Sequence, residues 1–312
     1  MNEDLRQLDR QIRKAFLRYR EIQHQRTRLE RIHYPQIMDW EVGTQEPPQV
    51  SDTNLLKQEV LSELGYSPAY FWELVEMEND MLPEFAELAA QHPLWEHFRW
   101  ISGIATTLMV VRYVARGGDV TRCPRVTNYW KGLGEDVLPD GSVPRRIRGR
   151  TKVKRRLPAM PHVTEVGELL RKAILTSNRG MLRDIYDREK PQYLEKHQYR
   201  TDKDSGEIQI DPETGKPKET PALWAHKHGL RIALKILDFC AWKAWREAYG
   251  LPAPDPYAFD ILNHPREHLI SFGDLYDKLE PAKPTVVRAG AHDIKRKFPD
   301  LYQPFARIEE PA

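Results

Sequence analysis

Cysteine is scarce in this chain of 312 residues, which contains only Cys123 and Cys240. The two lie far apart in the sequence, and neither belongs to a C-x-x-C pair or to a cluster of cysteine and histidine. The sequence therefore indicates neither a disulfide framework nor a structural zinc site. We expect no metal and no other cofactor, and free cysteines of this kind are typical of the reducing cytoplasm.

Long apolar stretches are also absent. The opening residues, MNEDLRQLDRQIRK, are charged throughout, and no later stretch approaches the roughly 18 consecutive apolar residues that a membrane helix needs. These features exclude a signal peptide and predict no membrane partner. No repeat of about 20 to 50 residues is visible either, which excludes a solenoid.

The totals show little excess charge of one sign, because 48 Lys and Arg nearly balance 46 Asp and Glu. The distribution is uneven, however, since eight of the twelve residues from 145 to 156 are basic and none is acidic. Eight positive side chains cannot share a core, so they face solvent or contact phosphates. This basic run predicts a salt-dependent interface with DNA or RNA. Its members are Arg145, Arg146, Arg148, Arg150, Lys152, Lys154, Arg155 and Arg156.

Apolar residues recur every three or four positions through much of the chain, a pattern typical of amphipathic helices. We therefore predict a mainly α protein with an N-terminal helical arm and a helical domain that contains a helix-hairpin-helix. The expected organisation is an arm or coiled coil over 1–34, a linker over 35–53, a helical domain over 54–257 with a mobile loop near 200–220, and an irregular tail over 258–312.

Prolines and glycines set the expected helix ends. Pro35 is expected to end the arm, and separate helices are expected over 68–77 and 82–90. The strongest helical pattern lies over 221–250, where the aromatic side chains are expected to form core. These side chains are Phe239, Trp242 and Trp245.

The arm carries a heptad seam of apolar residues that Arg26 interrupts. Two interpretations remain open for it. The helix packs on its own chain, or it forms a coiled coil with a second copy and makes the protein a homo-oligomer. The seam consists of Leu5, Leu8, Ile12, Ala15, Tyr19, Ile22 and Leu29.

The stretches PLWEHFRW, ISGIA and TTLMVVRYVA follow one another as a short helix, a glycine-containing turn and a second helix would. Free N–H groups at the start of a helix attract anions, so the turn residues Gly103, Ile104, Ala105 and Thr106 are candidate phosphate contacts. The alternative is that Gly103 is an ordinary helix cap and Ile104 a core residue.

Further residues in the same order extend the pattern: Gly118-Asp119, Arg122-Cys123, and Trp130 to Leu133, followed by LLRKAIL and AHKHGLRIALKILDFCAWKAWREAYGLP. Over residues 92–257 this order resembles the C-terminal transposase domain of the DEDD-type, RNA-guided insertion-sequence transposases. Ala105 stands where the strict hairpin pattern has a second glycine. The resemblance implies DNA binding in transposition or recombination, with a guide RNA as a further partner.

The nuclease half of that family, which holds four acidic residues on a ribonuclease-H-like core, has no counterpart before Pro93. We interpret Glu73, Glu76, Glu78 and Asp80 as a solvated helix face. The family resemblance also implies a serine nucleophile in the loop after the Gly-Leu segment, where Ser142 is the only serine. The alternative is a turn serine in Asp140-Gly141-Ser142.

Two other functions compete with DNA binding. The first is a helical scaffold or adaptor that dimerises through the arm and binds RNA or an acidic partner through the basic run. The second is a helix-hairpin-helix glycosylase with Asp119 behind the hairpin, which ranks last because the turn lacks a suitable lysine.

Overall fold

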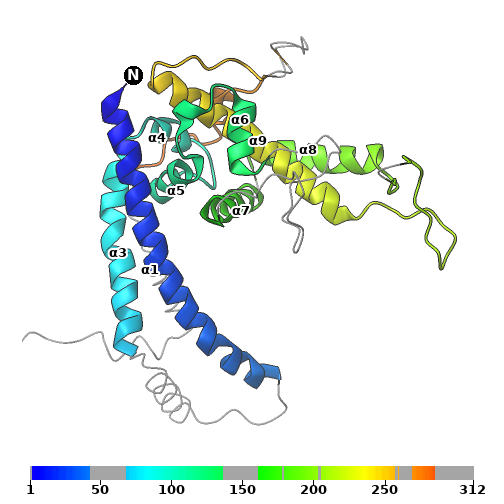
Figure 1. Ribbon diagram of the computed structural model, residues 1–312, viewed down its shortest axis with the longest axis horizontal. Helices are drawn as coiled ribbons and strands as arrows, with labels where there is room; N and C mark the ends of the chain where they lie inside the picture. Colours follow the sequence, from blue (N-terminus) through cyan, green and yellow to red (C-terminus); the bar gives the residue numbers. More distant parts are fainter. Residues whose placement is uncertain are drawn as a thin grey trace, which may run out of the picture. The chain divides into compact units, whose positions relative to one another are not determined.

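The computed structural model describes residues 2–42, 68–135, 161–177, 179–202, 205–256, 259 and 269–284. Side chains are described for most of these residues, but not beyond Thr27 in the first helix. The protein is mainly helical, which confirms the predicted fold class (Figure 1). Its elements are α1 (Glu3–Val42), α3 (Pro68–Gln91), α4 (Pro93–Phe98), α5 (Thr107–Gly117), the 3-10 helix η1 (Val120–Arg122), α6 (Val126–Leu133), α7 (Pro161–Thr176), α8 (Met181–Lys196), α9 (Ala222–Ala248) and α11 (Phe272–Leu275).

The chain divides into two compact units. The first unit comprises Met1–Arg13 and Leu88–Pro284, and the second comprises Lys14–Glu87 and Thr285–Ala312. The boundary falls inside α1 and α3, so each of these helices contributes to both units.

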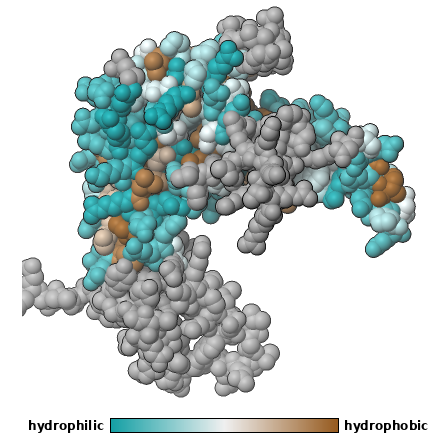
Figure 2. Space-filling view, in the orientation of Figure 1, coloured by the Kyte–Doolittle hydropathy of each residue, from teal (hydrophilic) through white to brown (hydrophobic). Residues whose placement is uncertain are grey.

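Helix α9 is the centre of the first unit. It packs against α8, α7, α4 and α6, while α5 packs against α7 (Figure 1). The aromatic side chains Phe239, Trp242 and Trp245 are buried on α9, as the sequence predicted. Among the coloured residues on the face drawn in Figure 2, most are hydrophilic, with a few hydrophobic side chains between them.

The first turns of α1 are attached to the first unit by a buried polar triad. Asp9 accepts hydrogen bonds from His92 Nε2 at 3.0 Å and from the Tyr249 hydroxyl at 2.7 Å. His92 also caps α4, because its Nδ1 accepts the Leu94 N–H. This acceptor role leaves the ring hydrogen on Nε2, facing Asp9. Burial raises the pKa of Tyr249, so its hydroxyl keeps the proton that it donates.

The second unit contains the remaining turns of α1 and most of α3. Tyr19 and Phe85 meet edge to face, with ring centroids 5.3 Å apart. The seam residues Ala15, Tyr19 and Ile22 are buried in this single chain. Of the two interpretations of the arm, the structure therefore supports the helix that packs on its own chain.

Two predicted helix ends were wrong. Helix α1 continues past Pro35 to Val42, and α3 is one helix from Pro68 to Gln91 with Pro83 inside it. An internal proline costs about 3 kcal/mol because it removes one backbone hydrogen bond and crowds the preceding turn. In α3 the buried side chains on either side of Pro83, Leu82 and Phe85, offset that cost by packing.

The prediction of a solvated acidic face was wrong for Glu78. Glu73, Glu76 and Asp80 are exposed, but Glu78 is only 1% exposed. Its carboxylate accepts hydrogen bonds from Arg26 Nε at 2.6 Å and from Nη2 at 3.4 Å. Arg26, which interrupts the apolar seam of α1, therefore supplies the counter-charge that lets a carboxylate be buried.

The described residues 198–202 and 205–220 are mostly exposed and contain three isolated antiparallel bridges, Tyr199–Glu219, Thr201–Ile208 and Ile210–Pro217. The bridges lie in the stretch predicted as a loop near 200–220. None of the helices within the described ranges is long and apolar enough to cross a membrane.

We predict that Glu78→Ala lowers the free energy of unfolding by about 3 to 5 kcal/mol, because it leaves the Arg26 guanidinium buried without this partner. Chemical denaturation followed by circular dichroism measures the change. Glu73→Ala, which removes an exposed carboxylate from the same helix, is the matched control and should change stability by less than about 0.5 kcal/mol. Equal effects of the two substitutions would contradict the assigned role of the buried pair.

Candidate nucleic-acid interface

The predicted hairpin residues lie between α4 and α5, in the predicted order. Thr106 is the N-cap of α5, and its hydroxyl accepts the Met109 N–H at 3.1 Å. Ile104 is buried in the core, Ala105 and Thr106 are half-buried, and Gly103 is exposed. The core position of Ile104 agrees with the simpler alternative for this turn, while the phosphate contact remains a prediction.

Gly103 has both a conformational and a steric reason to be glycine. Its φ of +82° lies in the left-handed region. A Cβ at this position would lie 2.7 Å from the carbonyl oxygen of Ala173, near the end of α7. The turn therefore rests directly on the backbone of α7, which joins the hairpin to the helix that follows the basic run.

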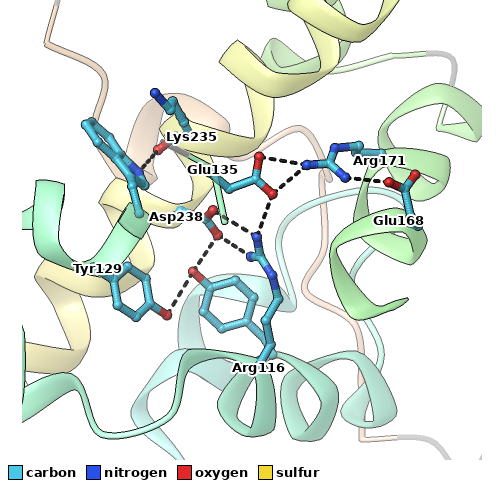
Figure 3. Close-up of polar contacts among 9 residues, drawn as sticks. Arg116, Tyr129, Glu135, Glu168, Arg171, Lys235 and Asp238 are labelled. Carbon is cyan, nitrogen blue, oxygen red and sulfur yellow. Dashed lines mark hydrogen bonds and ion pairs between the residues drawn. The ribbon is translucent and has the colours of Figure 1, made fainter. Parts of the chain in front are cut away.

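A buried ionic network connects α5, the end of α6, α7 and α9 (Figure 3). At its centre, the side chain of Arg116 has no solvent exposure. Its Nη1 donates to Asp238 Oδ1 at 2.6 Å, and its Nη2 donates to Glu135 Oε1 at 3.1 Å. Burial by itself lowers the pKa of Arg116, but Asp238 and Glu135 outweigh this effect and raise it. The guanidinium therefore stays charged.

Two tyrosines complete the environment of Asp238. The Tyr113 hydroxyl donates to Asp238 Oδ1 at 2.9 Å, and the Tyr129 hydroxyl donates to the Tyr113 oxygen at 3.4 Å. Burial and the nearby Asp238 raise the pKa of Tyr113 well above its ordinary value, so it remains a donor. Burial also raises the pKa of Asp238, while Arg116 opposes this shift by stabilising the carboxylate.

Glu135 connects this network to α7, the helix that follows the segment with the basic run. It is the last described residue before residues 136–160, and α7 begins directly after them. Arg171, the eleventh residue of α7, donates through Nη2 to both Glu135 oxygens, at 2.5 and 2.6 Å (Figure 3). The residue directly before the segment is thus paired with the helix that follows it.

The eight basic residues of the run and Ser142 lie outside the described residues. The structure therefore shows the residues on either side of this segment, Glu135 and the start of α7, but not what the segment contacts. Helix α7 contacts both the turn, where Ala173 lies against Gly103, and Glu135, through Arg171.

More positive charge lies beside the network on α9. The ammonium of Lys235 is 5.0 Å from the ring centroid of Trp130, whose Nε1 donates to the Lys235 carbonyl oxygen at 3.2 Å. Arg231 is partly buried, and this burial lowers its pKa, while the nearby Glu135 opposes the shift.

The motif residues 118–123 have structural roles. Asp119 caps η1, accepting the Thr121 N–H at 3.1 Å and its hydroxyl at 2.6 Å. Burial raises the pKa of Asp119, but the bonds from Thr121 outweigh that effect and lower it. Arg246 of α9 donates to the carbonyl oxygens of Val120 and Cys123, both at 3.2 Å. These contacts hold the segment on α9.

Sequence reasoning missed Arg116, Asp238 and Arg246. A signal was present, because each of them interrupts an apolar helix face with a charged residue. Arg116 and Asp238 are 122 residues apart in the sequence, so no local pattern could indicate that they pair.

Within the parts of the chain that the structure describes, no group of three or more His, Cys, Asp or Glu side chains is placed to hold a metal ion. Comparison with protein-family models, with curated proteins and with solved structures found no match in any of the three.

We predict that Asp238→Leu lowers the free energy of unfolding by about 3 to 5 kcal/mol, because Arg116 would keep only Glu135 as a counter-charge in a buried site. Thermal or urea unfolding measures the loss. Glu168→Leu removes a carboxylate that pairs with Arg171 but is 67% exposed, and should cost less than about 1 kcal/mol. A small loss for Asp238→Leu would mean that the network does not organise the fold.

We further predict opposite signs for two glycine substitutions. Gly103→Ala should destabilise the protein by about 1 to 2 kcal/mol or more, since its backbone is left-handed and its Cβ would meet Ala173. Gly132→Ala should stabilise it by about 0.4 to 1 kcal/mol, because Gly132 lies within α6 with open space around it. Unfolding midpoints of the two variants provide the test, and a neutral Gly103→Ala would contradict the close approach of the turn to α7.

Proposed function

We propose that this protein binds nucleic acid, with duplex DNA as the expected ligand, through the basic run at 145–156 and the turn between α4 and α5. The proposed setting is transposition or recombination, as the resemblance to insertion-sequence transposases implies. Catalysis is not part of this proposal.

One observation carries the proposal. Eight basic side chains occupy a segment that begins directly after Glu135 and ends at α7, and Glu135 is paired with Arg171 of that helix. An arginine-rich segment with fixed ends loses less conformational freedom on binding than one attached at a single end. This arrangement favours binding, because the residues on either side of the basic segment are held by the fold.

The order of the elements gives additional support. Helix α4, the turn, α5, the capped segment at Asp119, α6, the basic run and α7 follow one another as the motifs of the transposase domain do. Two cationic groups of α9 add support, because Arg231 lies near Glu135 and Arg171 and Lys235 lies over the ring of Trp130 in α6.

The test is a fluorescence-anisotropy titration against duplex DNA, single-stranded DNA and a structured RNA at several salt concentrations. The wild type should bind duplex DNA with a Kd of about 1 μM or tighter at low salt. Changing Arg145, Arg146, Arg148 and Arg150 to Ala should weaken binding and reduce the slope of log Kd against log salt by up to about 3.6, at about 0.9 per phosphate contact.

The matched control removes four exposed positive charges elsewhere, by changing Arg188, Lys196, Lys216 and Lys227 to Ala. It has the same net charge as the test variant, so a general electrostatic effect would appear equally in both. Weak binding of all three ligands by the wild type, unchanged in the test variant, would overturn the proposal. Preference for RNA over duplex DNA would overturn the choice of ligand.

A further inference from the structure

The turn between α4 and α5 is covered by a later segment of the same chain. Residues 269–284, here called the strap, contain the short helix α11. The N–H groups of Asp277 and Lys278 donate to the Trp100 carbonyl oxygen at 3.1 and 3.2 Å, and the Ala282 N–H donates to the Arg99 carbonyl oxygen at 2.9 Å. The strap is thus hydrogen-bonded to the end of α4, directly before the turn.

Aromatic contacts hold the strap in the same place. The His97 ring stacks on Phe272 with centroids 4.4 Å apart, and its Nδ1 lies 2.7 Å from the Tyr276 hydroxyl. Tyr276 also stacks on Trp100. Tyr276 is 37% exposed, and the backbone bonds to the end of α4 come from residues after α11, so residues 276–282 can open while Phe272 and Leu275 of α11 stay buried.

The strap places a carboxylate at the turn. Asp277 Oδ1 accepts the backbone N–H of Ser102 at 2.7 Å. A Cβ on Gly180 would overlap the same carboxylate, so the glycine leaves room for it. The exposed guanidinium of Arg179 lies at the turn as well, where its Nε donates to the Ser102 hydroxyl at 3.2 Å.

A backbone N–H and a guanidinium are the groups that bind phosphate oxygens in protein–DNA interfaces. A carboxylate oxygen accepts the same hydrogen bonds as a phosphate oxygen. The turn therefore forms an anion site in which a side chain of the protein is already the anion.

We propose that Asp277 occupies a phosphate-binding site of the turn, and that a nucleic-acid phosphate must displace residues 276–282 of the strap to bind there. This inference rests on the proposed function, since it identifies how one of the two contacts is regulated. A strap that is closed in about nine of ten molecules lowers the apparent affinity about tenfold, because only the open fraction can bind.

The experiment compares single substitutions in the full-length chain. Asp277→Asn retains an acceptor for the Ser102 N–H and removes the charge that competes with phosphate. It should bind duplex DNA about tenfold more tightly than the wild type. Glu280→Gln makes the same change in net charge at an exposed position on the strap and should alter affinity far less.

A second variant weakens the attachment of the strap without removing the negative charge of Asp277. Tyr276→Ala loses the stack on Trp100 and the bond to His97, but keeps Asp277. It should also bind DNA more tightly than the wild type. Hydrogen exchange of the wild type on adding DNA should become faster in residues 276–282 and slower at Ser102.

The outcomes separate the two proposals. If the wild type binds DNA and Asp277→Asn matches Glu280→Gln, the strap inference is overturned while the proposed function stands. If neither the wild type nor Asp277→Asn binds at low salt, the proposed function fails, and the strap inference fails with it. Tighter binding by both Asp277→Asn and Tyr276→Ala supports the inference.

Discussion

The guanidinium of Arg116 is fully buried, and the first unit is organised around the groups that neutralise it. Removing a charge from water costs several kcal/mol unless counter-charges and hydrogen bonds replace the solvent. Here Asp238 of α9 and Glu135 at the end of α6 supply the counter-charges, and Tyr113 donates to the same carboxylate. Since these groups come from different elements, the relative positions of α5, α6 and α9 depend on one side chain. Arg171 extends the constraint to α7 through Glu135.

This constraint connects the fold to the proposed function. The segment that carries the basic run begins directly after Glu135 of the network and ends at α7, which the network holds through Arg171. The same α7 supports the turn at Gly103, where the Ala173 carbonyl leaves no room for a side chain. A single helix therefore supports both proposed phosphate contacts. The strap adds a competing anion at one of them, so the two contacts need not become available together.

A buried ion pair plays a similar part in the second unit. Arg26 and Glu78 each break a pattern when read separately, one as a cation in an apolar seam and the other as one of several carboxylates on a helix. Side by side at 2.6 Å, each accounts for the burial of the other. The seam of α1 is covered within the chain at Ala15, Tyr19 and Ile22, so a second copy is not needed to bury it.

The sequence by itself determined the mainly helical fold, most of the helices and the aromatic core of α9, because periodic apolar residues and glycine or proline signals act over a few neighbouring positions. It also located the glycine-containing turn between α4 and α5 and the concentration of basic charge. Only the tertiary structure decided that α1 and α3 continue through Pro35 and Pro83, that Arg26 pairs with Glu78, that Arg116 pairs with Asp238, and that Asp277 lies at Ser102. Each ion pair or hydrogen bond in that set joins residues far apart in the chain. Local periodicity carries no information about which distant charge will meet another, since that depends on how the helices pack.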